Sequence, residues 1–219
     1  MVLISCRPAG DKKPVTLNSK TDSISYVIGL DYGEGIKNQE INVNRDLVYR
    51  GLIDGLEGNP ALPDSVKIDL ITRFQDELDN KEKIVFDKML SENKKKGKEF
   101  MAENSKNPGV ESLPDGLQYK ILKTGTGIRP VKADSVTIHY RAMFTDRLTF
   151  DMSYDRGPAG IRLDQTIRGL AQGIALMNEG SIYEFYIPSD LAYGDLNFQN
   201  LIPAGSTLIY TVELIKVHQ

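Results

Sequence analysis

The sequence predicts an α+β protein made of two parts that differ in composition. Residues 21–106 contain only two prolines, Pro60 and Pro63, and their apolar residues recur at helical spacing. Beyond residue 116 the spacing changes to the alternation typical of β-strands, as in "SVTIHYRAMF". These observations predict an all-helical N-terminal half followed by an antiparallel half-barrel sheet wrapped on one short helix.

Two short helices are expected first. Thr21 or Asp22 is suited to cap the first helix, and Asn44 is suited to cap the second. Gly58, followed by asparagine and proline, would end the second helix. The apolar residues at helical spacing are Ile24, Val27 and Ile28 in the first helix and Val48, Leu52 and Leu56 in the second.

A third helix of unusual length follows. Pro63 and Asp64 would start it, and the pattern continues to about Asn104, a span of roughly 60 Å. Its second half includes "ENKKKGKEF" and is expected to be mostly solvated, with Gly97 weakening the last turns by about 1 kcal/mol relative to alanine. So long a helix cannot pack wholly against two short ones. The short-helix region is therefore expected to need a partner, the alternative being a monomeric three-helix bundle with a frayed tail.

The second half of the chain follows a linker and turn region, "SKNPGVESLPDG" at residues 105–116. Strong alternation in three later segments predicts an antiparallel sheet covered on one face. Between them, "DQTIRGLAQGIALM" predicts a short helix with Ile167, Leu170 and Ile174 toward the sheet. The inward sets are Val136, Ile138, Tyr140, Ala142 and Phe144; Tyr183, Phe185 and Ile187; and Leu208, Tyr210, Val212 and Leu214.

Composition and motifs exclude several classes of function. A net charge of -3 argues against a general nucleic-acid binder, and no apolar run reaches the roughly 18 residues of a transmembrane helix. The sequence has no CxxC, P-loop, GxSxG or HExxH motif. His139 and His218 lie on expected strands, near no motif, and are interpreted as surface residues. We therefore expect neither a nucleophile nor a metal or organic cofactor.

The single cysteine, Cys6, lies in "MVLISC", which looks like the tail of a bacterial lipoprotein signal. The apolar segment is too short for a working signal, so one interpretation is that the chain starts inside a longer precursor with Cys6 as its lipidation site. The other is an apolar N-terminus with an incidental thiol. Residues 1–20 are expected to be a flexible tether.

An apolar loop raises a further question. The stretch "DLAYGDLNFQNLIPAGSTLIY" has the glycine, asparagines and proline of a loop. Yet it also carries Tyr193, Phe198, Leu201 and Ile202, which either plug a core or line a pocket.

Several motifs of the second half occur together in a recognisable order. They are "GLQYKILKTGTG", "VTIHYRAMFTDRLTFDMSYDRGPA", "LDQTIRGLAQGIALMNEGS" and "YEFYIPSDLAYGDLNFQNLIPAGSTLIYTVELIKV". With them, residues 112–219 resemble an FKBP-type peptidyl-prolyl cis–trans isomerase. The resemblance implies an FKBP-like half-barrel and catalysed rotation of X–Pro peptide bonds.

Position by position, the resemblance also implies a prolyl pocket. Asp151 and Tyr193 would be its catalytic residues, and the Ile167 N–H would hold a substrate carbonyl. Asp151 is expected to be a buried carboxylate that pairs with Arg156 and bonds Tyr140; whether it orients the wall or places charge near the carbonyl carbon is open. The implied substrate-binding residues are Tyr140, Phe150, Arg156, Ile167, Leu170, Phe198, Leu201, Ile202 and Tyr210.

Three features depart from the family pattern. Leu170 stands where the family usually has tryptophan, so the pocket floor is expected to be smaller and deeper. Tyr210 replaces the usual phenylalanine and brings a hydroxyl that needs a partner if it is buried. The segment "FQNLIP" lacks the glycines common in this loop, which predicts a stiffer lid.

The N-terminal half resembles the helical dimerisation region of the macrophage-infectivity-potentiator and FkpA-like isomerases. The resemblance implies a tether at 1–20, a helical dimerisation domain with a long connecting helix at 21–106, and an isomerase domain at 107–219. It further implies a V-shaped homodimer, joined through residues 21–80, that assists folding of proline-containing proteins in the bacterial envelope as a periplasmic or outer-membrane lipoprotein. Macrolide binding is a further implication. The alternative function is a client-holding chaperone with weak or incidental isomerase activity.

Overall fold

The structure is a computed structural model that describes residues 15–131 and 134–218. Contacts divide the chain into two compact units, one up to Leu70 and one from Ile71. Cys6 and most of the expected tether lie outside the described residues. Within those residues, none of the helices combines the length and apolar character needed to cross a bilayer.

The N-terminal unit begins with helices α1 (Lys20–Asn38) and α2 (Arg45–Glu57). The predicted cap of α1 was wrong: Ser19 caps it, because its extended backbone lets its hydroxyl accept from the Asp22 N–H at 3.1 Å. Asp22 instead lies in the first turn, where its carboxylate accepts from the N–H of Asn18. The predicted boundaries of α2 are confirmed, with Asn44 as its cap and Gly58 ending it at a left-handed φ of 67°.

Helix α3 (Asp64–Asn104) runs for 41 residues, as predicted. Its second half is mostly exposed, as predicted, but one side of it packs against the sheet domain. Gly97 is buried, and a Cβ at this position would lie 2.3 Å from Oγ1 of Thr207. Glycine here does not fray the helix; it lets the helix backbone lie directly against the sheet domain.

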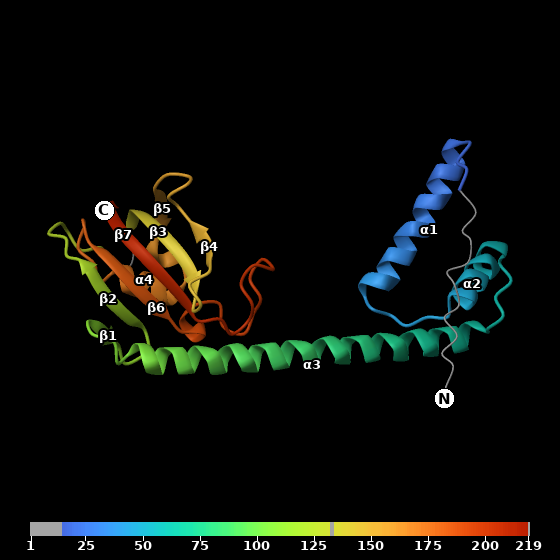
Figure 1. The fold of residues 1–219 in the computed structure, drawn as a ribbon, viewed down its shortest axis with the longest axis horizontal. Helices are drawn as coiled ribbons and strands as arrows, with labels where there is room; N and C mark the ends of the chain where they lie inside the picture. Colours follow the sequence, from blue (N-terminus) through green and yellow to red (C-terminus); the bar gives the residue numbers. More distant parts are fainter. Residues whose placement is uncertain (1–14, 132–133, 219) are drawn as a thin grey trace, which may run out of the picture. The chain divides into compact units, whose positions relative to one another are not determined.

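Seven strands form one antiparallel sheet in the order β1-β2-β6-β7-β3-β4, with β5 paired to β3 (Figure 1). Strand β1 falls inside the segment expected to be only linker and turn, where it pairs with β2. The strands are β1 (Val110–Ser112), β2 (Gln118–Lys123), β3 (Ser135–Phe144), β4 (Thr149–Met152), β5 (Ala159–Arg162), β6 (Ile182–Ile187) and β7 (Leu208–His218).

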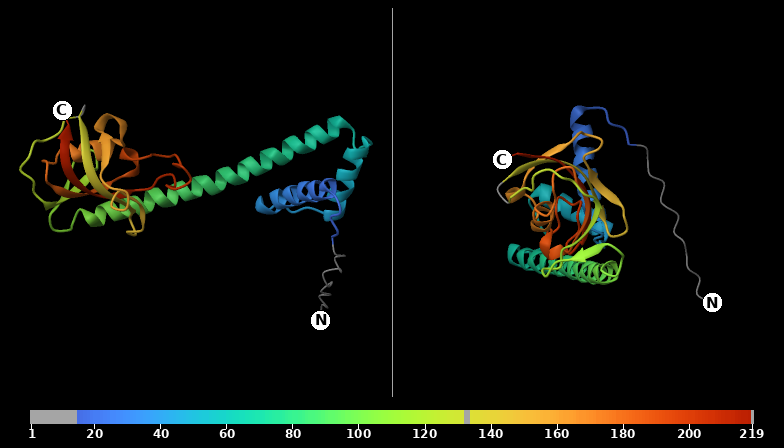
Figure 2. Two further views of the ribbon diagram at one scale, coloured as in Figure 1. Left: turned by 90° about the horizontal axis from the view of Figure 1, so that it is seen from above. Right: turned by 90° about the vertical axis from the view of Figure 1, so that its left-hand side faces the viewer.

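The sheet curves around the short helix α4 (Arg168–Ile174), as the views in Figure 2 show. Single turns of 3₁₀ helix, η1 (Leu163–Gln165) and η2 (Ser189–Leu191), precede α4 and follow β6. Leu170 and Ile174 of α4 pack into the main core against the inward residues of β3, β6 and β7. A Cβ at Gly173 would lie 2.6 Å from the ring of Phe185, so the helix and sheet are in close contact.

The outer face of the sheet is also partly covered, which corrects the expectation of a sheet covered on one face. Met143, Tyr186 and Ile209 form a second buried cluster, against which Phe100 and Met101 of α3 pack. Nearby, the buried Glu184 accepts from both terminal nitrogens of Arg147, at 2.8 and 3.0 Å. Alternation did not reveal this cover because it comes from a helix distant in sequence.

Candidate functional site

An aromatic wall forms where β3, β4 and β7 lie side by side. The register places Ala142 of β3 between Asp151 on one neighbour and Tyr210 on the other. The pairing of β4 skips Phe150, so a β-bulge turns that ring toward its neighbours. The ring centroid of Phe150 lies 4.8 Å from Phe144 and 6.4 Å from Tyr210, while Tyr140 lies 6.2 Å from Tyr210.

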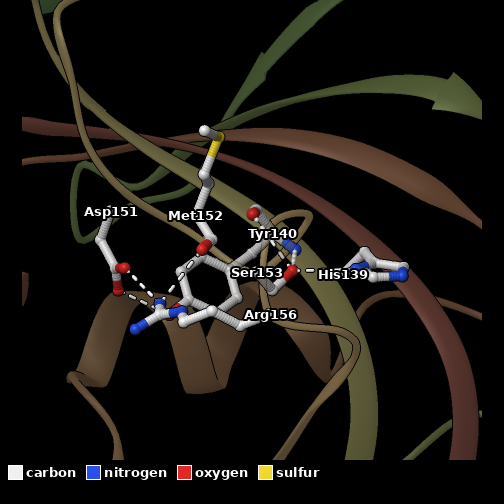
Figure 3. A network of polar contacts seen from close by, with 6 residues as sticks. All are labelled: His139, Tyr140, Asp151, Met152, Ser153 and Arg156. Atoms are coloured by element: carbon white, nitrogen blue, oxygen red, sulfur yellow. Dashed lines mark hydrogen bonds and ion pairs between the residues drawn. The ribbon is translucent and has the colours of Figure 1, made fainter.

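A polar triad borders this wall (Figure 3). The hydroxyl of Tyr140 donates to Asp151 at 2.5 Å, and Arg156 donates to both Asp151 and the Tyr140 oxygen. Burial, and then the bond to Asp151, raises the pKa of Tyr140 to about 12. The expected partners are present, but the Asp151 side chain is 39% exposed rather than buried, because it lies at a strand end.

Sequence reasoning missed Ser153. Its side chain is buried, accepts from the Tyr140 N–H at 2.8 Å and lies 3.0 Å from Nδ1 of His139 (Figure 3). The His139 ring in turn stacks on Tyr154 at 4.7 Å. These contacts fasten β3 to the chain just after Asp151. The available signal was a small polar residue two positions beyond Asp151 in "DMSYDRG".

The entrance to α4 supplies a backbone donor. Ile167 has an extended backbone and caps the helix, accepting from the N–H groups of Leu170 and Ala171. Across the described parts of the chain, no hydrogen bond engages the N–H of Ile167 itself. Leu170, in place of a larger indole, is 5% exposed and belongs to the main core.

The opposite side of the site is the pocket loop, residues 193–206. The rings of Tyr193 and Phe198 stack at 4.2 Å, and Phe198 pairs with Ile202 in an isolated bridge. Ile202 is buried in the main core, whereas Leu201 is exposed. The turn between Phe198 and Leu201, "QN" at 199–200, has positive φ values of 50° and 54°, conformations that usually call for glycine.

The extra hydroxyl of Tyr210 belongs to the aromatic wall, near Tyr193. Tyr210 is 7% exposed. Burial is the largest cause that raises the pKa of both tyrosine side chains. Both hydroxyls therefore stay protonated at neutral pH.

The geometry suits binding of an apolar ring beside an amide group. The wall, Leu170 and Ile202 provide apolar contact, and the N–H of Ile167 and the hydroxyl of Tyr193 provide donors. Of the predicted site residues, Arg156, Phe198 and Leu201 lie at the exposed rim.

Two family models match successive parts of the chain. Residues 21–121 match the domain amino terminal to FKBP-type peptidyl-prolyl isomerase, and residues 127–215 match FKBP-type peptidyl-prolyl cis-trans isomerase. The chain is 39% identical to the outer membrane protein MIP of Legionella longbeachae, over 92% of this chain and 88% of that protein. It is 38% identical to FkpA of Aeromonas hydrophila, over 89% and 75%.

Solved structures agree. The crystal structure of FkpA from Escherichia coli matches with a TM-score of 0.73 and 28% identity, over 92% of this chain and 98% of that one. A peptidyl-prolyl isomerase from Pseudomonas syringae matches with a TM-score of 0.56 and 34% identity, over 59% and 96%. These likenesses confirm the predicted fold class and the resemblance of both halves. The chain belongs to the FKBP-type peptidyl-prolyl cis–trans isomerases and is an enzyme of that class.

Proposed function

We propose that X–Pro isomerisation takes place in the aromatic pocket, with Asp151 and Tyr193 as its catalytic residues. The observation that carries this assignment is that the aromatic wall, Ile167 and Tyr193 pack against one core, where the Tyr193 hydroxyl and the unengaged N–H of Ile167 offer two donors. The proposed substrate-binding residues are Tyr140, Phe150, Arg156, Ile167, Leu170, Phe198, Leu201, Ile202 and Tyr210.

Such a pocket needs no nucleophile. Rotation about the X–Pro bond meets a barrier of about 18–20 kcal/mol because the planar amide is resonance-stabilised. An apolar wall disfavours the planar, dipolar amide relative to the twisted one, which binds the transition state more tightly than the substrate. The donors at Ile167 and Tyr193 hold the chain part-way around its turn, each contributing about 0.5–1.5 kcal/mol.

Asp151 acts through position and charge in this proposal. Because it accepts from Tyr140 and Arg156, it fixes the Tyr140 ring and keeps negative charge at the edge of the pocket. Tyr140 and Arg156 donate hydrogen bonds to it and keep their protons, so proton transfer has no part in the proposed reaction.

The test is catalysed cis–trans exchange of an X–Pro peptide, followed by NMR. The parent chain should accelerate exchange, and Tyr193→Ala should lower kcat/KM by about tenfold, the loss expected for one hydrogen bond with its ring contacts. Tyr32→Ala is the control, since Tyr32 is an exposed tyrosine of α1. Full activity of Tyr193→Ala would place the chemistry elsewhere.

We further propose that residues 21–80 form a homodimer. None of the residues of α1, all of them described, is buried, and Asp54 is the one buried residue of α2. Apolar side chains on both helices, such as Val27 and Leu52, are therefore exposed in a single chain, which favours a second copy as cover. The proposed working division is a tether at 1–20, a dimerisation domain at 21–106 and an isomerase domain at 107–219.

Light scattering tests the dimer, which should have twice the 24.4 kDa mass of one chain. Small-angle scattering tests the proposed V shape, in which two isomerase domains face a client between the arms. A monomer at micromolar concentration would contradict both proposals.

The proposed setting is the bacterial envelope, where the protein would assist folding of proline-containing clients. A relative named outer membrane protein MIP supports this setting. We propose Cys6 as the lipid attachment site of a periplasmic or outer-membrane lipoprotein. Labelling with radioactive palmitate tests it: the parent should incorporate label and Cys6→Ser should not, whereas equal labelling would exclude this cysteine.

Macrolides that occupy the family's prolyl pocket are proposed ligands, and they should compete with the peptide. A second candidate function is client holding, favoured by the small floor residue Leu170. Under that function, suppression of client aggregation would persist in Tyr193→Ala. Under the isomerase function, acceleration of proline-limited refolding would be lost in the same variant.

A further inference from the structure

Helix α3 contacts the pocket loop, residues 193–206, near both ends of that loop. The side-chain amide of Asn93 donates to the backbone oxygen of Ala204 at 2.9 Å. One residue further along the helix, Lys94 pairs with Asp195 at 2.5 Å. Figure 1 shows this loop beside the C-terminal part of the helix. A helix that connects the two parts of the chain therefore touches the segment that carries Tyr193 and Ile202.

The backbone around Ala204 joins the two ends of the pocket loop. Ala204 is fully buried, and its N–H donates to the side chain of Asn197 at 2.8 Å. The next residue, Gly205, donates its N–H to the oxygen of Gly194 at 2.8 Å, which joins the two ends of the loop directly beside Tyr193. A displacement of Ala204 would therefore be passed to Tyr193 through one backbone hydrogen bond.

Two glycines allow the helix to lie this close. A Cβ at Gly97 would lie 2.3 Å from Oγ1 and 3.3 Å from Cβ of Thr207, the residue that follows the loop. Gly205 has a φ of +76°, and a Cβ there would lie 3.0 Å from the backbone oxygen of Leu90. The helix backbone thus meets the Thr207 side chain at Gly97, and the loop backbone at Gly205 lies close to Leu90, so a shift of the helix meets the loop directly.

We propose that Asn93 is a positioning residue for isomerisation, which holds the pocket loop on α3 so that Tyr193 is presented to the substrate. This inference rests on the pocket assigned above. Asn93 acts through its bond to Ala204, and the effect passes on through Gly205 and Gly194. Because the Lys94–Asp195 pair is solvent-exposed, it contributes less than the partly buried amide bond.

Asn93→Asp is the first test. The substitution keeps the shape of the side chain but replaces its donor with an acceptor facing the oxygen of Ala204. We expect kcat/KM for an X–Pro peptide to fall about three- to tenfold. Amide hydrogen exchange should rise at residues 194–206 alone. Asn80→Asp, the same change at an exposed position of α3, is the control, and Asn93→Gln, which keeps a donor, should recover part of the activity.

A second test forces the helix off the loop by size. Gly97→Ala should lower kcat/KM, Thr207→Ala alone should change it less than twofold, and the double variant should recover, because removing Oγ1 relieves the contact. The proposal is overturned if Asn93→Asp matches Asn80→Asp in kcat/KM, or if exchange rises in the loop while kcat/KM does not change. Loss of activity in Tyr193→Ala, measured in parallel, keeps the pocket assignment separate from this result.

Discussion

The two units of this chain use their apolar residues in opposite ways. In α1 no residue is buried, and large side chains such as Val27 of α1 and Leu52 of α2 remain 60% and 48% exposed. In the sheet domain, Phe185 and Leu208 are fully buried in a continuous core. The sheet domain therefore has the burial of a unit that is stable alone, whereas the helical unit leaves its large apolar side chains exposed.

The largest expected effect comes from opening the sheet core. Phe185→Ala should lower the free energy of unfolding of the sheet domain by about 3–5 kcal/mol, because the cavity beside Gly173 cannot close. Val27→Ala should leave that domain's unfolding unchanged. Urea unfolding followed by the isomerase activity measures both, and equal losses would erase the contrast between the units.

The next effect is on assembly. Leu52→Asp should abolish the proposed dimer, because it would place a carboxylate in the shared apolar interface. Leu122→Asp is the matched control, since Leu122 of β2 is 50% exposed in the sheet domain. Light scattering should report half the mass for the first variant only. Peptide isomerisation should survive in both, and a dimeric Leu52→Asp would refute α2 as part of the interface.

Acid should weaken the sheet domain through Glu184. Burial alone would raise the pKa of this carboxyl, but bonds from Arg147 and Tyr186 outweigh burial and lower it below 4.5. A carboxyl with a lowered folded pKa stabilises the fold above its unfolded value and loses that contribution as pH falls through the folded value.

Thermal unfolding between pH 6 and pH 3 tests this pH dependence. The thermal midpoint of the parent should decrease as the pH is lowered below about 4.5, and Glu184→Gln should make this decrease smaller. Glu34→Gln, a change on exposed α1, should decline like the parent. A parallel decline in Glu184→Gln would assign acid sensitivity to other groups.

The smallest effect concerns the hydroxyl of Tyr210 in the proposed pocket. Tyr210→Phe should lower kcat/KM about two- to fivefold, because the hydroxyl of Tyr193 loses a polar neighbour in the aromatic wall. Tyr183→Phe, which changes another buried tyrosine of the sheet, should have no such effect. Stopped-flow refolding of a protein limited by proline isomerisation provides the measurement. Identical rates for the parent and Tyr210→Phe would show that the Tyr210 hydroxyl does not contribute to catalysis.

Local patterns predicted most of the elements, and the family resemblance predicted the partners of Asp151. Alternation identified the inward residues of β3, β6 and β7, and Asn44 and Gly58 marked the ends of α2, because these signals act over a few residues. The cover provided by Phe100 and the role of Gly97 depend on contacts between distant segments, which no local pattern contains. Ser153 was missed because a buried serine resembles a turn residue in sequence.

The turn at Gln199 and Asn200 holds backbone strain next to the proposed pocket. Side chains in left-handed conformations cost about 1 kcal/mol or more each, and the bridge between Phe198 and Ile202 keeps the turn in this conformation. Glycine at either position would relieve the strain without altering any group proposed to meet the substrate. Substitution at this turn is therefore a route by which the stiffness of the loop can change while Tyr193 and Ile202 are kept.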